Sequence, residues 1–425
     1  MYKKIGYFHH LDQDGTLLSF NEIELKLPKD NKKSIEIVKE VKKENLIKKY
    51  FNHLNSGITP LVLNPEIPDS KTDSLLNVLE KDSNSYSSLS HITCSSGTTS
   101  HNGPIKTFSF PIQRPLSNSR AHYASLQVNE PIKVLFPMPL THSFGVVIGM
   151  LGTVEMGHSL YTFQETPRND VLLNVIDDQE IDLLYLTPTL TRLLLKHLKR
   201  KKISNSKKIK ISIGAAHIYK SEILELMKHF PNAQIFYTYG LSEVGPRVST
   251  LDCGTLDKNQ MSNIEEEVLP IGRPLNGVEL QIKDKLLHVK SIYTNTNIDQ
   301  EVFFNTMDEA SSDSKNTFLR GRTDNTINFA GVNIYPQEME PIINRILELS
   351  SVLIAMPSKL YGEIPVLVIE ATKENENDFS TKDFIDKLSL EVSTKIHPQR
   401  IVFLRNFPRT SMGKIKRKNI QSLIS

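Results

Sequence analysis

The stretch Gln234-Ile235-Phe236-Tyr237-Thr238-Tyr239-Gly240-Leu241-Ser242-Glu243 carries the strongest fold signal of the 425-residue chain. Its first part, Gln234 to Tyr237, is a short apolar segment of the kind that forms a buried strand. Tyr239 to Glu243 then adds an aromatic ring, a glycine, a hydroxyl and a carboxylate. At one strand end, such a set could stack a base, contact a phosphate and hold a Mg²⁺ ion. Taken singly, each residue could also serve only to cap the strand.

Apolar segments of strand and helix type alternate upstream of this stretch. Alternation of this kind predicts an α/β architecture with parallel strands, whose ends are the usual place for ligands. Nearer the N-terminus, the apolar spacing predicts one amphipathic helix over Lys33 to Tyr50 and a buried strand over Pro60 to Leu63. The alternating segments are Lys133–Phe136, Gly145–Val154, Ile181–Leu186, Thr189–Leu198, Lys210–Ile213 and Lys220–His229.

The composition changes near Arg320, and the remaining hundred or so residues are enough for a separate small domain. We place the boundary at Gly321 to Asn325. The prediction is a large N-terminal domain over 1–320, with α/β layers and mixed, largely parallel sheets, and a small mobile C-terminal α+β domain over 321–425. The elements expected in the small domain are Thr326–Ile334, Pro336–Leu349, Val352–Met356, Val366–Glu370, Lys382–Ile396 and Ile401–Leu404.

Composition excludes several classes of protein. Lys plus Arg is 51 and Asp plus Glu is 48, and the net charge of +3 argues against a nucleic-acid partner. Cys94 and Cys253 form no CxxC pair, which disfavours disulfides and thiolate zinc sites and indicates a reducing, cytoplasmic setting. The longest apolar run, Phe144 to Val154, is far shorter than the roughly 20 residues of a membrane span. We therefore expect no export and no transmembrane helix.

Two further stretches contain residues suited to chemistry. Thr93 to Ser100 places hydroxyls around one glycine directly after an expected strand, and such a turn can aim N–H and hydroxyl groups at phosphate oxygens. A polar surface loop is the alternative. Pro408 to Ile415 places Lys414 on a glycine-containing turn in a basic tail. Walker P-loop, GxGxxG and HExxH motifs are absent from the sequence.

Together and in this order, the motifs resemble the adenylate-forming superfamily of acyl-CoA synthetases, aryl-acid ligases and peptide-synthetase adenylation domains. The resemblance spans about Asn52 to Lys418. Five motifs carry it: the phosphate loop Ser95–Thr99, the Tyr-Gly-x-Thr-Glu motif at Tyr239–Glu243, the Thr-Gly-Asp motif at Thr306–Asp308, the hinge Gly321–Asp324 and the catalytic-lysine motif Pro408–Lys414. The phosphate loop starts earlier than in most members, which implies an N-terminally shortened member.

The resemblance also implies a role for each matching residue. ATP and Mg²⁺ are the expected cofactors, and a small carboxylic acid with CoA or a phosphopantetheine carrier protein are the expected partners. Lys414 would bridge the acid and the α-phosphate, and Glu243 would hold Mg²⁺ and act in catalysis. The nucleotide would be held by Ser95, Ser96, Gly97, Thr98 and Thr99 at the phosphates, Gly214, Ala215, Ala216 and Tyr239 at the adenine, Gly240 and Ser242 in the turn, Asp308 at the ribose, and Arg322 beside the hinge residue Asp324.

The activation of an acid by ATP explains why residues of these types would be needed. A carboxylate that attacks the α-phosphorus of ATP brings two anions together, so the site must neutralise charge and align the attack. Departures from the family pattern are Ser100 and Met307 in place of glycines, Asn328 in place of a common lysine, and Lys106 displaced by an apparent insertion.

The segment Pro139 to Gly145 resembles the part of the family that borders the acid pocket, with His142, Ser143 and Phe144 as pocket residues. No acidic residue lies between Pro137 and Thr153, which favours an acid without an α-amino group. A purely structural role for His142 and Phe144 remains open. The leading hypothesis is an ATP-dependent acid:thiol ligase. Alternatives are amino-acid adenylation for a peptide-synthetase carrier and a noncatalytic nucleotide-binding relative.

Overall fold

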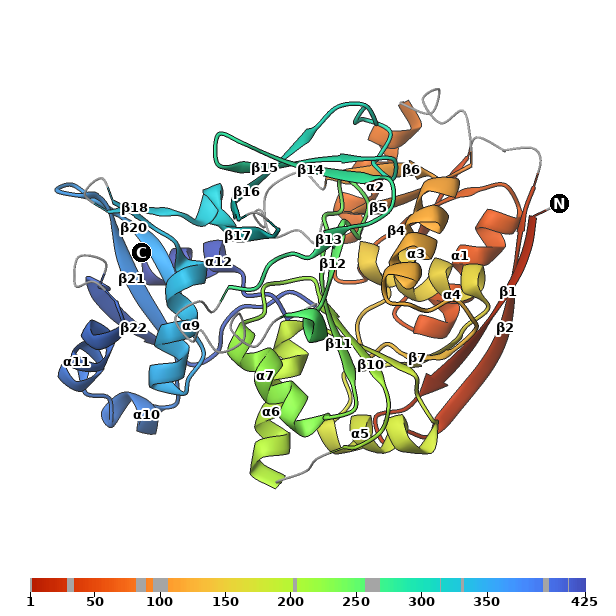
Figure 1. The fold of residues 1–425 in the computed structure, drawn as a ribbon. Helices are drawn as coiled ribbons and strands as arrows, with labels where there is room; N and C mark the ends of the chain where they lie inside the picture. The colour runs from red at the N-terminus through yellow and green to blue at the C-terminus, as the bar shows by residue number, and fades with distance from the viewer. Residues whose placement is uncertain are drawn as a thin grey trace.

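The computed structural model describes residues 2–28, 34–81, 89–94, 106–201, 205–256, 268–313, 315–329, 332–392, 397–411 and 413–425. Figure 1 shows the C-terminal elements, in blue, at one end of the molecule and the N-terminal strands, in red, at the opposite end. Sheets and helices of the middle of the chain lie between them. A large unit with mixed, largely parallel sheets and a smaller α+β unit confirm the predicted fold class.

A sheet of nine described strands forms the centre of the large unit, in the order β13-β12-β11-β10-β9-β7-β8-β1-β2. The neighbours from β11 to β1 pair in parallel, and the remaining pairs are antiparallel. Every residue of the inner strand β9 is buried, as expected for a parallel strand covered on both faces. The bounds are β1 Tyr2–Leu11, β2 Leu17–Leu27, β7 Lys133–Leu135, β8 Ser159–Phe163, β9 Leu183–Leu186, β10 Lys210–Gly214, β11 Gln234–Tyr239, β12 Ser249–Asp252 and β13 Arg273–Pro274.

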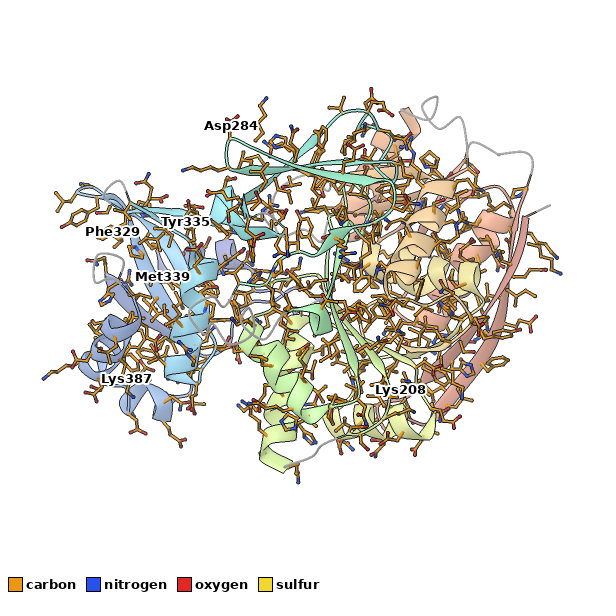
Figure 2. All side chains as sticks on the ribbon, viewed as in Figure 1. Lys208, Asp284, Phe329, Tyr335, Met339 and Lys387 are labelled. Atoms are coloured by element: carbon orange, nitrogen blue, oxygen red, sulfur yellow. The ribbon has the colours of Figure 1, made fainter. Side chains whose placement is uncertain are left out.

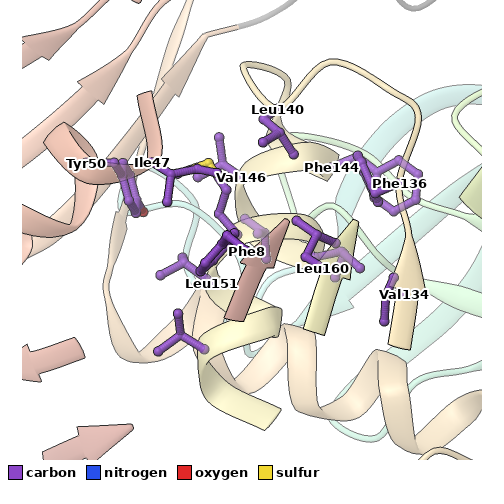
Figure 3. Packing of buried hydrophobic residues seen from close by; sticks show 14 of the residues in the cluster. Phe8, Ile47, Tyr50, Val134, Phe136, Leu140, Phe144, Val146, Leu151 and Leu160 are labelled. Atoms are coloured by element: carbon purple, nitrogen blue, oxygen red, sulfur yellow. The ribbon is translucent and has the colours of Figure 1, made fainter. Parts of the chain in front are cut away.

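Helices cover both faces of this sheet and create two cores. Phe8 of β1 and Leu160 of β8 pack with Ile47, Val146 and Leu151 of the helices on one face (Figure 3). The second core lies under α5, α6 and α7. The helices are α1 Lys43–Asn55, α3 Gln113–Ser125, the π-helix η2 Gly145–Leu151, α4 Gly152–Met156, α5 Asn169–Asp178, α6 Pro188–Lys201 and α7 Lys220–His229.

A second sheet corrects the prediction of one helix over Lys33 to Tyr50. Ile35–Val38 forms strand β3 and pairs in parallel with β4, and the helix begins only at Lys43. The spacing of the apolar residues fits both structures, and pairing with a fully buried neighbouring strand decides between them. The sheet consists of β3, β4 Thr59–Val62, β5 Ser90–Cys94 and β6 Thr107–Pro111, with α2 Asp69–Lys81 between β4 and β5.

An antiparallel sheet completes the large unit and leads to the small one. Fully buried and partly buried residues alternate along β15, as on a strand with one face toward the core. The strands are β14 Val278–Lys283, β15 Leu286–Ser291, β16 Phe304–Ser312 and β17 Thr317–Arg322, and the short helices η3 Cys253–Thr255 and η4 Thr323–Asn325 lie before and after them.

The small unit has its own sheet and core. Met339 of α9, labelled in Figure 2, belongs to this core together with Leu353 and Leu367. Its elements are β18 Ile327–Phe329, β19 Val332–Ile334, α9 Pro336–Leu347, β20 Ser351–Ser358, β21 Gly362–Glu370, α10 Lys373–Asn377, α11 Thr381–Glu391, β22 Arg400–Leu404 and α12 Arg417–Ile424. Within the described ranges, no helix combines the length and apolar character needed to cross a membrane.

Candidate active site

Two separate sequence motifs meet at Tyr239 and Asp308. Tyr239 is the last residue of β11, and its hydroxyl donates a hydrogen bond to the Asp308 carboxylate on β16. Both side chains are buried. Burial raises the pKa of Asp308, and the hydrogen bond from Tyr239 and the charge of Arg322 act in the opposite direction. A tyrosine and a carboxylate are thus held together where the central and antiparallel sheets meet.

Arg322 connects this pair to the predicted hinge. Its Nη1 lies 3.5 Å from Asp308 Oδ1, and its Nε donates to Asp324 Oδ1 at 3.1 Å. The next residue, Thr323, donates from Oγ1 to the Met307 carbonyl at 3.3 Å. The last strand of the large unit is therefore fastened to the turn that carries Asp308.

Met307 adopts the backbone conformation that glycine would adopt freely. Its φ is +62°, in the left-handed region, and its side chain is 46% exposed. A residue with a Cβ pays about 1–2 kcal/mol for this conformation. The irregular stretch of β16 before Asp308 is therefore kept in shape although the glycine is lost, with Asn305 Oδ1 accepting from the Met307 N–H at 2.8 Å.

The turn after β11 depends on the close approach of two backbone segments. A Cβ at Gly240 would lie 1.9 Å from the Pro246 carbonyl oxygen, so only glycine fits there. Ser242 Oγ lies 3.0 Å from Ser143 Oγ, which joins this turn to the predicted acid pocket. The Glu243 carbonyl accepts from the backbone and side chain of Asn295, at 3.1 and 2.8 Å. These bonds fix the position of Glu243.

A small cavity, with room for about one water molecule, lies beside this turn. Thr93, Ser143 and Ser242 line it, and the buried Thr93 hydroxyl has no hydrogen-bond partner among the described residues. Thr93 lies near the end of β5, directly before the predicted phosphate loop. The loop residues Ser95, Ser96, Gly97, Thr98 and Thr99 lie outside the described residues.

The end of β10 lies beside the end of β11, where the adenine was predicted. Gly214 pairs with Thr238 across these two parallel strands, and a Cβ at Gly214 would lie 2.5 Å from Thr238 Oγ1. Ala215 has a φ of +75°, and Ala216 is exposed. The three residues therefore leave the sheet in a sharp turn at the same edge as Tyr239.

Lys414 reaches the large unit on a tight turn. Thr410 and Lys414 are joined by backbone bonds, and Gly413 between them has a φ of +77°. The Thr189 hydroxyl donates to the Gly413 carbonyl at 3.2 Å, and Asn64 Nδ2 donates to Ser411 Oγ at 3.3 Å. In Figure 1 the chain between β22 and α12 reaches the middle of the molecule, near β11.

The charges around Lys414 bring the separate motifs into one site. Removal from water lowers the pKa of Lys414, and the positive charges of Arg322 and Arg247 lower it further. The carboxylates of Asp308 and Glu243 act in the opposite direction. One electrostatic environment is thus shared by residues of β16, β17, the turn after β11 and the C-terminal tail.

The predicted acid-pocket residues lie at the same place. Burial lowers the pKa of His142 to about 3, and the charges of Lys414 and Arg247 contribute. The Phe144 ring packs against Phe136, with ring centroids 5.3 Å apart (Figure 3). His142 is therefore a neutral imidazole that the charges of two cations reach.

Arg247 is a buried residue of this site that the sequence analysis missed. It is buried, and its guanidinium carbon lies 3.4 Å from the centroid of the Phe144 ring. Its only sequence signal is an arginine between small and apolar residues at Val244 to Val248.

The chemistry of Glu243 fits a magnesium ion held partly by a nucleotide. The described residues contain no group of three or more His, Cys, Asp or Glu that could enclose a metal by itself. Mg²⁺ is usually held by one or two carboxylates, water and substrate phosphates, and a single glutamate meets that requirement.

The AMP-binding enzyme family matches residues 26–291, which is more than half of the chain, and this protein belongs to that family. Among curated relatives, it is 24% identical over 314 residues to 4-coumarate–CoA ligase-like 6 of Arabidopsis thaliana, covering 68% of this chain and 54% of the relative. It is 25% identical over 296 residues to 2-succinylbenzoate–CoA ligase of Lactococcus lactis, covering 67% and 60%. The chain spans little more than half the length of these relatives.

Solved structures share the fold at low sequence identity. The o-succinylbenzoate CoA synthetase of Bacillus subtilis, in complex with its acyl-adenylate intermediate, has a TM-score of 0.75 at 16% identity, covering 92% of this chain and 89% of that chain. ATP-bound MatB of Rhodopseudomonas palustris has a TM-score of 0.75 at 16% identity, covering 99% and 97%. These likenesses support the same arrangement of a large N-terminal and a smaller C-terminal domain.

Proposed function

We propose that this protein activates a carboxylic acid with ATP to form acyl-AMP and pyrophosphate, and then transfers the acyl group to a thiol of CoA or of a carrier-protein pantetheine. One observation supports it above the others: Lys414 of the small unit shares an electrostatic environment with Asp308 and Glu243 of the large unit. A partly buried lysine can stabilise the phosphates of a bound nucleotide as they meet a second anion, and the two carboxylates can hold the ribose and the metal ion.

In the first step, a carboxylate oxygen of the acid attacks the α-phosphorus, and the bond from that phosphorus to the bridging oxygen of pyrophosphate breaks. Lys414 approaches both anions and reduces their repulsion as the new bond forms. Asp308 accepts hydrogen bonds from the ribose hydroxyls, and Tyr239 supports the adenine. Mg²⁺, when bound at Glu243, would supply additional positive charge to the phosphates.

Phosphate binding itself falls to the loop Ser95–Thr99. The buried hydroxyl of Thr93, near the end of the strand before that loop, has no hydrogen-bond partner among the described residues and supports this assignment. A hydroxyl-rich turn can donate several hydrogen bonds to phosphate oxygens.

For the second step, we propose that residues 1–320 and 321–425 act as separate domains and that the small domain rotates about Asp324. In the described part of the chain, hydrogen bonds from Thr189 and Asn64 join the Lys414 turn to the large unit. Rotation would withdraw Lys414 and admit a thiol, whose sulfur attacks the acyl carbon and expels AMP.

A pyrophosphate-exchange screen over aliphatic, aromatic and amino acids tests the first step. We expect acid-dependent exchange, which Lys414→Ala lowers at least about 100-fold with little change in ATP affinity. Lys418→Ala, an exposed lysine on the following helix, is the matched control and should retain exchange. Exchange that survives Lys414→Ala would remove the role assigned to it. Exchange driven only by amino acids would select adenylation for a peptide-synthetase carrier.

A further inference from the structure

Arg247 is a buried cation whose donors are mostly unused. It is the largest fully buried side chain among the described residues. Its Nη1 donates to the Pro246 carbonyl at 3.2 Å. Its Nε and Nη2 are also buried, and neither has a hydrogen-bond partner in the part of the chain that the structure describes. One edge of the guanidinium is thus left without acceptors.

No described carboxylate neutralises this charge. Arg247 is absent from the ion pairs of the described residues, and burial lowers the pKa of Arg247 to about 9. Arginines elsewhere in the chain illustrate the contrast, because the Arg417 guanidinium donates to both oxygens of Glu340, at 2.7 and 2.6 Å. Buried charges in proteins are normally paired, since an isolated one is costly. An anion from outside the chain would complete this site.

Arg247 lies beside Phe144, a residue of the predicted acid pocket. Phe144 covers one face of the guanidinium, and Nη1 lies 3.3 Å from the point where a Cβ at Gly214 would be. The charge of Arg247 acts on both His142 and Lys414. Arg247 therefore lies between the predicted acid-pocket wall and the strand edge that would hold the nucleotide.

We propose that the acid substrate carries a second anionic group: it is a short dicarboxylate, and Arg247 Nε and Nη2 donate to its distal carboxylate. The inference rests on the proposed function and specifies its substrate. The Nε and Nη2 edge of a guanidinium matches the two oxygens of a carboxylate. The proximal carboxylate then lies toward Lys414 for activation. A long apolar acid meets the bulk of the Arg247 side chain and leaves its charge unpaired, so the pocket disfavours it.

The test compares diacids with monoacids of equal length: succinate with butyrate, and glutarate with valerate, in ATP–pyrophosphate exchange. We expect a kcat/KM ratio for diacid over monoacid of roughly 100 or more in the wild type. Arg247→Met has similar length and no charge, and it should bring that ratio to about one or below. Arg247→Lys keeps the charge but not the paired donors, so its ratio should lie between those of the wild type and Arg247→Met.

A binding measurement keeps the test decisive if a variant is inactive. Calorimetric titration of succinate into protein saturated with a non-hydrolysable ATP analogue should give an affinity that Arg247→Met lowers roughly 100-fold. Arg247→Met should also unfold at a higher temperature than the wild type without ligand, because it removes unpaired buried donors. That result shows that the variant is folded.

Each outcome distinguishes the substrate class from the reaction. The protein could catalyse exchange with monoacids, with a diacid-to-monoacid ratio of kcat/KM that Arg247→Met leaves unchanged. That result would overturn the dicarboxylate inference and keep the proposed function. Absence of exchange with every acid, together with succinate binding that depends on Arg247, would overturn the proposed function and support the anion site. Succinate that binds no better than butyrate in the calorimetric experiment would overturn the inference.

Discussion

The hydrogen bond from Tyr239 to Asp308 should contribute measurably to the stability of the large unit. Tyr239→Phe removes only the hydroxyl and leaves the buried Asp308 carboxylate with fewer donors. A hydrogen bond to a charged group contributes about 1.5–3 kcal/mol. We therefore expect the free energy of unfolding to fall by about 2 kcal/mol at neutral pH. Urea titration followed by circular dichroism measures it.

Tyr237→Phe is the matched control. Tyr237 lies two residues earlier on the same strand and is also buried, but its hydroxyl makes no hydrogen bond to Asp308. Removal of the Tyr237 hydroxyl should lower the free energy of unfolding by less than removal of the Tyr239 hydroxyl. Equal losses in the two variants would show that the Tyr239–Asp308 bond does not stabilise the fold.

The pH dependence gives a second check on this pair. The pKa of Asp308 is raised in the folded protein, chiefly by burial, so its contribution to stability is present at low pH and is lost as the pH rises through that value. The bond from Tyr239 lowers this pKa, and Tyr239→Phe therefore raises it further. The difference between variant and wild type should shrink as the pH falls through the raised pKa of Asp308, because the carboxyl is then protonated in both folded proteins. A difference independent of pH between 3 and 7 would contradict the assignment to Asp308.

Three other substitutions test the site. Gly240→Ala should lower the free energy of unfolding by at least about 2 kcal/mol, because its Cβ meets the Pro246 carbonyl. The control Gly321→Ala, whose Cβ meets nothing closer than 3.8 Å, should change the free energy of unfolding by less than about 0.5 kcal/mol. Comparable losses of stability in the two variants would refute the close approach at Gly240. Met307→Gly should raise the free energy of unfolding by about 0.5–1 kcal/mol through relief of the left-handed backbone, and Met307→Ala, which keeps that strain, should not. Glu243→Gln should raise the Mg²⁺ concentration for half-maximal pyrophosphate exchange at least about tenfold, and an unchanged Mg²⁺ titration would remove Glu243 from the metal site.

The sequence predicted the elements whose apolar residues lie in buried parallel strands. β9, β10 and β11 are short and almost wholly apolar, and such segments have few alternatives once turn residues bound them. The hairpin of β1 and β2 was not predicted, because β2 lies at the sheet edge and is mostly exposed, which leaves little apolar alternation. The helix predicted from Lys33 was wrong over β3, where pairing with β4 outweighs local periodicity.

The individual site residues were predictable only where a motif contained them. Tyr239, Asp308 and Arg322 each belong to a motif, and they meet where the end of β11 approaches β16 and β17 of the antiparallel sheet. Arg247 belongs to none, and an arginine in a sequence is normally read as exposed. Only the fold shows that it is buried beside Phe144.

The charge balance around Lys414 explains why the site should need its ligands for full stability. Arg322 and Arg247 both disfavour the protonated form of Lys414, while Asp308 and Glu243 favour it. Asp308 already shares its carboxylate with Tyr239 and Arg322, so one carboxylate, Glu243, remains opposite the other positive charges. A nucleoside triphosphate and a dicarboxylate would each bring negative charge to this cluster and lower the repulsion among its cations. Each ligand should therefore raise the unfolding temperature of the protein.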